Sequence, residues 1–281
     1  MKKLNILIFI LVFILVFPSF AVANDSLIKA VKDGNSQKVK ELVNSGVDIN
    51  YQDNKGKTPL IHAAEEGKLE IAKILLNNGA KVDVTTINYE NTALMFASAM
   101  GNYKVTKLLL KNGATVDKKS RDGLTALMVA AVRGHSNIVE LLIERGANID
   151  VKNNKEVTPL IYATFEGNNN IIKLLVNEGA DINSKDNNGI TPLMAASMKG
   201  NLKAVNFLLS NGAKIDSYDY SKETALFKAA KEGYPKIVEK LIQAGAKTNM
   251  KNSKGNTPLR IAELNKNKEV IEILKKQNNS K

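Results

Sequence analysis

The sequence contains no cysteine and no tryptophan, and only two histidines in 281 residues. Without cysteine, the chain cannot form disulfide bonds or use a thiol nucleophile. Aromatic residues are 5% of the chain whereas hydrophobic residues are 44%, so aliphatic side chains and alanine dominate. This composition can supply a continuous stacked core, but it has few of the bulky side chains around which a single globular core is built.

The scarcity of histidine limits the catalytic arrangements that are open to this chain. His62 has Glu65 three residues later on a predicted helix, but a second histidine four residues away, as in the zinc-protease pattern, is missing. We therefore expect a surface ion pair between His62 and Glu65, and we expect His135 to bond to loop backbone. An enzyme that uses His62 with nearby carboxylates is the alternative, and the absence of any completed catalytic motif argues against it.

Two short patterns imitate ligand-binding loops without completing them. Gly56-Lys57-Thr58 matches the end of a phosphate-binding loop, but the earlier glycine of that motif falls at Tyr51. The turn that begins at Asp53 lacks the alternating ligands and the distal glutamate of a calcium-binding loop. We therefore expect no cofactor and no metal ion.

An internal repeat runs through most of the sequence. Threonine followed by proline or alanine and then leucine recurs after 34 residues once and after 33 residues thereafter. The threonines are Thr58, Thr92, Thr125, Thr158, Thr191, Thr224 and Thr257. An alanine follows five residues later and, except in the last copy, a glycine nine residues later. Threonine suits a helix N-cap, proline the first helical position and glycine the end of a helix, so each copy predicts a short first helix.

A second helix is predicted after each of these glycines. In NIVELLIERGA, from Asn137 to Ala147, apolar residues recur at helical spacing before a closing glycine and alanine. The polar connector that follows predicts a turn or hairpin. A turn and two antiparallel helices in about 33 residues resemble the ankyrin repeat family. The resemblance implies an all-α solenoid of helix-turn-helix repeats joined by short β-hairpin-like turns.

The spacing also gives the expected extent of the repeats. Projected backward, it puts Asp25 in the threonine position of a first unit, which makes about eight units. The last unit has Glu263 in place of the second alanine of copies such as Ala63-Ala64, and Lys266 in place of the glycine, as expected of a terminal cap whose outer face meets water. The expected units of the ankyrin repeat domain, residues 24–281, are 24–53, 54–87, 88–120, 121–153, 154–186, 187–219, 220–252 and 253–281.

One connector is longer than the others by a single residue. Gly79 is followed by Thr92 after 13 residues, where the other copies have 12. We expect the extra residue to form a bulged hairpin tip near Tyr89.

The N-terminal segment differs from the repeats. Residues 1–23 contain two lysines, an apolar run from Leu4 to Phe17, the helix breaker Pro18 and small residues at Ala21 and Ala23. This layout is typical of a secretory signal peptide that is cleaved before the repeats, and an uncleaved membrane anchor is the alternative. We therefore expect an exported bacterial protein located in the periplasm or outside the cell.

The charge of the chain is strongly basic. The formal net charge is +12, and Lys2 and Lys3 are the charged residues before Asn24, which leaves +10 for the rest. Such a charge favours loose attraction to anionic envelope polymers or membrane surfaces, which is the alternative function. No basic recognition helix or interleaved aromatic motif is present, so we expect no nucleic acid partner.

Helical geometry separates two kinds of position on each first helix. At 100° per residue, the residues two, five, six and nine steps after the threonine lie on one side, and those at steps four and seven point away from it. In the copies that begin at Thr92, Thr125, Thr158 and Thr191, steps four and seven are apolar, whereas the neighbouring copies carry His, Glu or Lys. The resemblance implies that step four often packs between repeats, and that step seven and the residue before the threonine border a concave groove that binds partners.

The candidate binding residues follow from these positions. An apolar patch with a charged rim is typical of an interaction surface, and an aromatic anchor often dominates its binding energy, which makes Phe165 the leading candidate. We expect Phe96, Val129 and Tyr162, at step four, to belong to the core. The candidate partner-binding residues are Phe165, Met198, Val132, Met100, Leu124, Val157, Ile190 and Tyr89. The expected function is that of a monomeric, non-catalytic scaffold that binds a partner protein in the groove.

Overall fold

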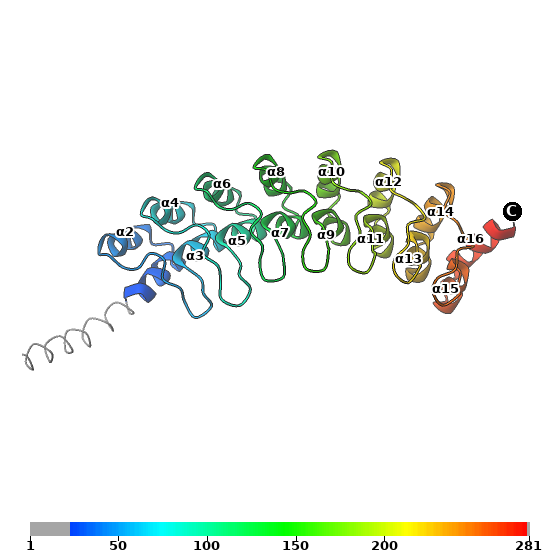
Figure 1. Ribbon diagram of the computed structural model, residues 1–281, viewed down its shortest axis with the longest axis horizontal. Coiled ribbons are helices and arrows are strands. Elements are labelled where there is room, and N and C mark those ends of the chain that lie inside the picture. The colour runs from blue at the N-terminus through cyan, green and yellow to red at the C-terminus, as the bar shows by residue number, and fades with distance from the viewer. Residues whose placement is uncertain (1–22, 280–281) are drawn as a thin grey trace, which may run out of the picture. The chain divides into compact units, whose positions relative to one another are not determined.

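The computed structural model describes residues 23–279, which form two compact units. The first, unit 1, ends at Ala126 and the second, unit 2, begins at Leu127 (Figure 1). The predicted signal peptide lies almost entirely outside the described residues and stays a prediction. Within residues 23–279, no helix is both long enough and apolar enough to span a membrane.

Unit 1 consists of helix pairs stacked in sequence order. It begins with the helical residues 23–32. The helices that follow are α2 (Ser36–Asn44), α3 (Pro59–Glu65), α4 (Leu69–Asn77), α5 (Ala93–Ala99) and α6 (Tyr103–Lys111). The first helices α3 and α5 pack on each other, as do the second helices α2, α4 and α6 in succession (Figure 1). Each first helix also packs on the second helix of its own repeat.

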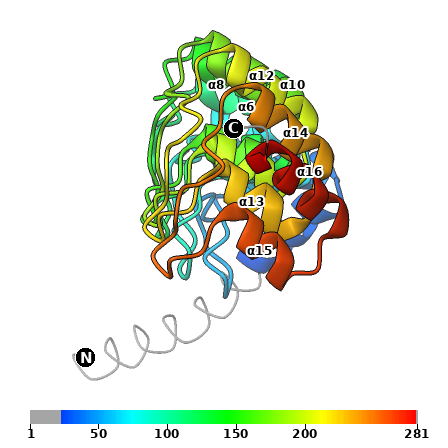
Figure 2. The same ribbon diagram turned by 90° about the vertical axis from the view of Figure 1, so that its right-hand side faces the viewer.

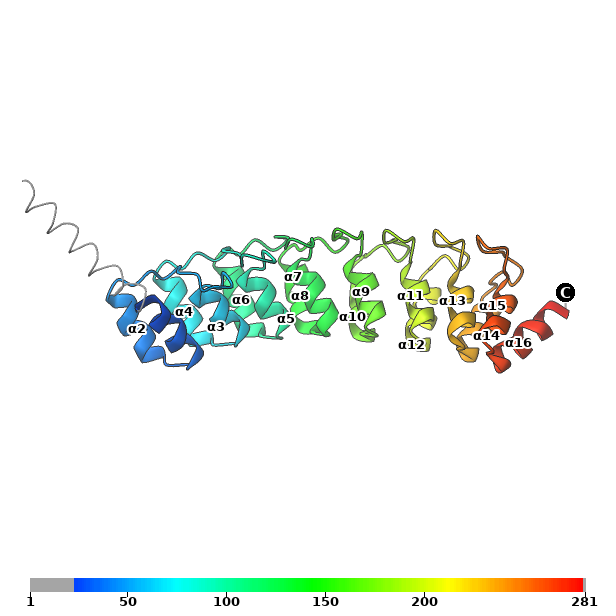
Figure 3. The ribbon, with the colours of Figure 1, turned by 90° about the horizontal axis from the view of Figure 1, so that it is seen from below.

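Unit 2 is built in the same way. Its helices are α7 (Ala126–Arg133), α8 (Ser136–Glu144), α9 (Pro159–Phe165), α10 (Asn169–Asn177), α11 (Pro192–Met198), α12 (Leu202–Ser210), α13 (Ala225–Glu232), α14 (Pro235–Gln243), α15 (Pro258–Leu264) and α16 (Lys268–Asn279). The first helices α9, α11, α13 and α15 form one layer, and the second helices from α8 to α16 form the other. Viewed from the end at α16, the turns of this unit lie beside its helices (Figure 2), and they run along one edge (Figure 3).

The predicted caps begin most of the first helices. The hydroxyl oxygen of Thr58 accepts a hydrogen bond from the backbone N–H of Ile61 at 3.2 Å, and Thr158 caps α9 in the same way. Thr224 differs, because its buried hydroxyl has no hydrogen-bond partner among residues 23–279. Gly233 ends α13 with a φ of 77°, a left-handed conformation that glycine adopts without steric strain.

The core of each unit consists of the apolar positions that the repeat predicts. In unit 1, Leu60 and Ala63 of α3 pack in the interior with Ile71 and Leu75 of α4, all with almost no solvent exposure. Leu160 and its equivalents are buried in the same way in unit 2. Because the core alanines are small, the two helices of each repeat can approach closely, which is why a chain with few aromatic residues fills its interior.

The connecting turns are less regular than hairpins of a sheet. Residues 23–279 contain no β-strand, and the turns contribute one isolated antiparallel bridge between Tyr218 and Thr224. Neighbouring turns are joined by single backbone hydrogen bonds, such as the one from Tyr220 N–H to Asn188 C=O at 3.1 Å. The turns are therefore held mainly by their own side chains.

Candidate functional site

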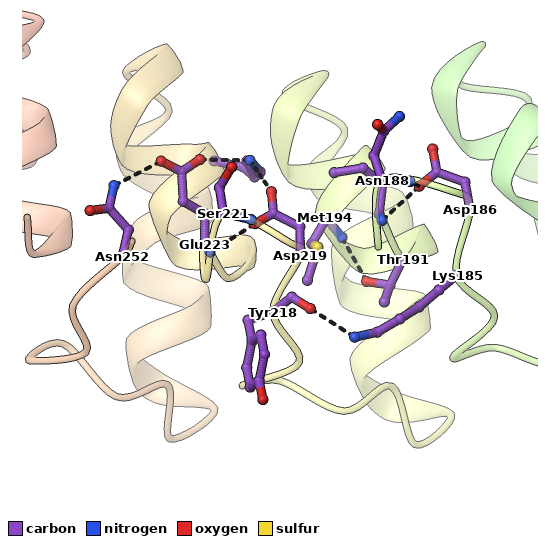
Figure 4. Close-up of polar contacts among 12 residues, drawn as sticks. Lys185, Asp186, Asn188, Thr191, Met194, Tyr218, Asp219, Ser221, Glu223 and Asn252 are labelled. Carbon is purple, nitrogen blue, oxygen red and sulfur yellow. Dashed lines mark hydrogen bonds and ion pairs between the residues drawn. The ribbon is translucent and has the colours of Figure 1, made fainter. Parts of the chain in front are cut away.

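The turns of regular length are organised by a polar residue that precedes the cap threonine by five positions, and in the long turn Thr86 precedes Thr92 by six. In unit 2, Asp219 Oδ1 accepts hydrogen bonds from the backbone N–H groups of Ser221 at 2.8 Å and of Glu223 at 2.9 Å (Figure 4). Asp186 and Asn153 hold their turns with the same pair of bonds. These turn residues are buried, and their side chains satisfy backbone donors that would otherwise lack partners.

The step-four residue of the first helix contacts the turn residue of its own repeat, nine positions earlier. Asn153 Nδ2 donates to the hydroxyl of Tyr162 at 2.8 Å. Lys228 Nζ lies 2.6 Å from Asp219 Oδ2. In both repeats, the polar side chain at step four therefore bonds to the polar residue that organises the turn. Sequence analysis missed this contact, although the nine-residue separation of the two polar residues is a signal that could have revealed it.

His62 belongs to such a cluster and is not on the surface. Its ring is 4% exposed, and Nε2 lies 2.9 Å from Asp53 Oδ2. Glu65 instead pairs with Lys57 at 2.6 Å. The predicted ion pair between His62 and Glu65 is therefore wrong, because His62 turns to Asp53 inside its turn while Glu65 reaches Lys57 at the end of that turn.

Burial and hydrogen bonding set the charges of this pair. Burial lowers the pKa of His62 below its ordinary value, and the hydrogen bond to Asp53 opposes that effect without reversing it. Burial would raise the pKa of Asp53, but the hydrogen bonds from the Lys57 amide, the His62 ring and the Lys55 amide outweigh it, so the pKa of Asp53 is lowered. The pair consists of a neutral imidazole that donates its Nε2–H to a carboxylate.

Lys228 is the centre of a second polar cluster. Its ammonium lies 2.6 Å from a carboxylate oxygen of Asp219 and 2.6 Å from one of Glu223. Asn252 of the next repeat donates to the other oxygen of Glu223 at 3.0 Å. Burial would lower the pKa of Lys228, but the hydrogen bonds to Asp219 and Glu223 outweigh it and raise the pKa. The cluster links two repeats through buried charge.

The predicted step-seven residues are partly exposed. Val132, Phe165 and Met198 lie in the last turns of α7, α9 and α11 in unit 2, where each side chain is partly open to solvent. The Nζ of Lys199 lies 6.0 Å from the centre of the Phe165 ring, within the range of a cation–π contact. Met100, at the end of α5 in unit 1, is 58% exposed. These four residues have the accessibility that a binding role requires.

Two residues that precede a cap threonine are not accessible. Val157 is 9% exposed and Ile190 is 8% exposed, so the expectation that they offer accessible side chains to a partner in the groove is wrong. The backbone N–H and C=O of Val157 both bond to Asn153, and those of Ile190 both bond to Asp186. These bonds fix the end of the turn, and the apolar side chain there is covered. Leu124, at the same position in unit 1, is partly exposed.

The step-four residues Phe96, Val129 and Tyr162 are partly buried, between core and surface.

Tyr89 is 63% exposed and lies in the long turn of unit 1, beside a pocket of about 390 Å³. Unit 2 also exposes a tyrosine in a turn, since Tyr218 is half exposed. The backbone C=O of Tyr218 accepts a 2.7 Å hydrogen bond from Lys185 Nζ (Figure 4). Among the described residues, no group of three or more His, Cys, Asp or Glu side chains could hold a metal ion.

Several curated proteins match a short part of this chain, each about a fifth of its length. A mouse (Mus musculus) 2-5A-dependent ribonuclease is 41% identical over 58 residues, 20% of this chain and 8% of that protein. Human (Homo sapiens) protein phosphatase 1 regulatory subunit 27 is 43% identical over 60 residues, 21% of this chain and 39% of that protein. A rabbit (Oryctolagus cuniculus) ankyrin repeat, SAM and basic leucine zipper domain-containing protein 1 is 37% identical over 57 residues. That match covers 20% of this chain and 12% of the rabbit protein.

The family match covers much more of the chain than any of these relatives. Residues 27–120, 112–186, 167–252 and 219–281 each match the family described as ankyrin repeats (3 copies). Together the matches extend from the first described helix to the end of the sequence, in agreement with the stacked helix pairs and their intervening turns. The chain belongs to the ankyrin repeat family.

Proposed function

We propose that this protein is a non-catalytic scaffold that binds a partner protein through the side of the first helices that carries Phe165. Ankyrin repeats generally mediate protein–protein interaction, which supports the general function, and the residues of this chain support the location. The observation that carries the proposal is the position of Val132, Phe165 and Met198. All three are partly exposed apolar residues at the same step of successive first helices in unit 2.

The core does not account for these residues. The core-facing positions of α9 are occupied by Leu160, Ile161 and Ala163, which are fully buried. The Phe165 side chain of the same helix is partly open to solvent. A large aromatic side chain in this position can bury additional apolar surface only when a partner covers it. Because α9 packs on α10 and α11, the backbone that carries Phe165 is already ordered, so binding would cost little backbone conformational entropy.

The substitution Phe165→Glu tests this proposal directly. Affinity capture from the envelope fraction of the host would compare the unaltered protein, Phe165→Glu and the matched control Asn170→Glu, which places the same charge on an exposed position of α10. A partner that persists at high salt, is lost with Phe165→Glu and is kept with Asn170→Glu supports the proposal. Equal capture by all three proteins contradicts it, and loss of that material in salt would favour attachment through the net positive charge.

Export is part of the proposal and rests on the predicted signal peptide in residues 1–23. The protein would meet its partner in the periplasm or outside the cell, as a monomer. Mass determination of the protein recovered from the host envelope and medium tests this point. A mass that corresponds to a chain beginning at Asn24 agrees with cleavage, and an intact chain in the cytoplasm contradicts export.

A further inference from the structure

The long turn of unit 1 accommodates its extra residue without losing its bonds to the neighbouring turns. Thr86 N–H donates to Asn91 C=O, which closes a turn one residue longer than the one from Asp53 to Lys57. Ile87 N–H still reaches Lys55 C=O at 3.3 Å. The extra residue therefore changes the shape of the turn near Tyr89, as the sequence predicts, while the turn stays connected to the preceding repeat.

Arg121 of the following repeat holds the other side of this turn. Its backbone N–H donates to Tyr89 C=O at 2.9 Å, and its guanidinium donates to Ile87 C=O at 3.2 Å. The guanidinium also lies 3.4 Å from a carboxylate oxygen of Glu90. Because the turn is bonded on both sides, the exposed Tyr89 side chain is carried by a fixed backbone.

A pocket of about 390 Å³ lies beside this turn in unit 1. Its lining comes from two neighbouring turns and from the first helix α5. The lining residues are Lys55, Lys57, Thr86, Asn88, Tyr89, Asn91 and Phe96. Two lysines and no acidic residue line it, and Tyr89 and Phe96 supply aromatic surface. The pocket therefore combines positive charge with an apolar wall.

The two lysines differ in what they are free to bind. Lys57 Nζ lies 2.6 Å from Glu65 and 4.6 Å from the centre of the Phe96 ring, so its charge is already paired. The exposed ammonium of Lys55 has no partner among the described residues, and neither have the side-chain amides of Asn88 and Asn91. One cation and two amide groups are thus available to a ligand that accepts hydrogen bonds.

We propose that this pocket binds an acidic segment of the partner protein, with a carboxylate on Lys55 and an adjacent aromatic side chain against Tyr89 and Phe96. The carboxylate matches the unpaired ammonium and the amide donors, and the aromatic wall accounts for the neighbouring side chain. The inference deepens the proposed function by stating the chemistry of the partner, and it rests on that function in taking the partner to be a protein.

The test uses defined peptides as probes of the purified protein. Acetyl-Glu-Glu-Phe-Glu-Glu-amide is compared with its counterparts that have Gln for every Glu, or Ala for Phe, by NMR titration at about 0.15 M salt, where distant charges are largely screened. We expect the acidic aromatic peptide to shift the backbone amide signals of Asn88, Tyr89 and Asn91. Both altered peptides should bind about tenfold more weakly, as expected for loss of one charge-assisted contact or one aromatic contact.

The chain offers a matched control for Lys55. Lys155 occupies the same turn position in unit 2, where its N–H donates to Asn153 and its C=O accepts from Asn187, as those of Lys55 do with Asp53 and Ile87. We expect Lys55→Gln to weaken peptide binding about tenfold and Lys155→Gln to leave it unchanged. Both lysines are exposed, so neither substitution should unfold the protein, which thermal melting would check.

Three results would overturn the inference. They are equal binding of the Gln peptide, equal effects of Lys55→Gln and Lys155→Gln, and signal shifts spread over lysines throughout the protein. The outcome is separable from that of the proposed function. If capture depends on Phe165 but the acidic peptide does not bind, the proposed scaffold function stands and the acidic pocket is rejected. If the peptide binds at the pocket but capture does not depend on Phe165, the pocket stands and partner binding through Phe165 is rejected.

Discussion

At the scale of single residues, the least expected feature is a buried lysine at step four of α13. Lys228 sits between Asp219 and Glu223, with both contacts at 2.6 Å, and all three side chains are largely withdrawn from solvent. Removal of one partner from a buried ionic cluster costs more than the cluster itself contributes, because the remaining charges stay buried without compensation. Loss of the Lys228 ammonium should therefore strongly lower the stability of the fold.

We predict that Lys228→Met lowers the free energy of unfolding by about 3 kcal/mol, because two buried carboxylates lose their cation. Urea titration would measure the change. Lys231→Met, on the exposed side of the same helix, is the control and should shift stability by less than about 0.5 kcal/mol. Acidification should restore part of the stability of Lys228→Met, because it neutralises the carboxylates. A loss no greater than that of the control would contradict the buried cluster.

His62 makes the stability of unit 1 depend on pH. Its pKa in the folded protein is lowered from the ordinary 6.5, so below about pH 6.5 the unfolded chain takes up a proton that the folded chain does not. Stability is therefore lost as the pH falls from 6.5 toward the pKa of the folded state, by at most about 1.4 kcal/mol per pH unit. Above pH 6.5 both states are neutral at this residue and the effect vanishes.

We predict that His62→Gln reduces this pH dependence. The Gln side chain can still donate a hydrogen bond to Asp53 but does not titrate. Free energies of unfolding measured from pH 7 to pH 5 should fall less steeply for the variant than for the unaltered protein. Identical slopes would mean that His62 titrates with the same pKa in the folded and unfolded states, against the lowered pKa of the folded protein.

At the scale of elements, contacts between adjacent turns limit which side chains the turns tolerate. Gly56 has a φ of 76°, and a Cβ atom added there would lie 2.5 Å from the backbone N of Ile87. Gly255 occupies the equivalent position of the last turn with a φ of 77°, and nothing lies within 4 Å of its added Cβ. The two glycines share the left-handed conformation, which would strain any other residue, and they differ in what the neighbouring turn places beside them.

We predict that Gly56→Ala destabilises the protein more than Gly255→Ala does. Both substitutions incur a left-handed backbone cost of about 1–2 kcal/mol, and Gly56→Ala adds about 1–3 kcal/mol for displacement of the long turn. The free energy of unfolding and the NMR signal of the Ile87 amide would measure the two effects. Equal destabilisation with an unmoved Ile87 signal would contradict close packing of the turns.

The helices and their caps could be predicted because each depends on a local pattern. The threonine caps, core alanines and closing glycines act within one repeat, and the helix pairs of both units form where these signals place them. The side chains before the threonines could not be placed in this way. Val157 and Ile190 are buried because their turns fold around Asn153 and Asp186, which depends on contacts that helical periodicity does not describe.

At the scale of the whole molecule, the candidate binding residues were predictable in part. Phe165 and Met198 are partly open to solvent because their angular position on a helix follows from the 3.6-residue period. The position of an extra residue near Tyr89 could be predicted from the repeat length. The pocket beside that turn could not be predicted, because Lys55 and Phe96 come from neighbouring repeats and meet only when the repeats stack.

The stacking also predicts how stability varies along unit 2. The first helices α9, α11, α13 and α15 pack on one another in succession, so α11 and α13 each have a first helix on both sides. α15 has α13 as its neighbour on one side, and Leu264 at its end is 54% exposed. In a repeat array, stability is approximately the sum of each repeat and its interfaces with its neighbours. A terminal repeat therefore opens without disrupting the interior repeats.

We predict that amide hydrogens in α15 and α16 exchange with solvent at least about tenfold faster than those in α11 and α13, which corresponds to about 1.4 kcal/mol less protection. Hydrogen–deuterium exchange followed by mass spectrometry would measure the difference, with intrinsic exchange rates used to correct for sequence. Removing a side chain at the interior interface should abolish the contrast, because Phe227→Ala deletes a fully buried ring in α13 and lowers the protection of α11 and α13 toward that of α15. Uniform protection across unit 2 of the unaltered protein would mean that its repeats unfold together, and the terminal repeat would then share the full stability of the unit.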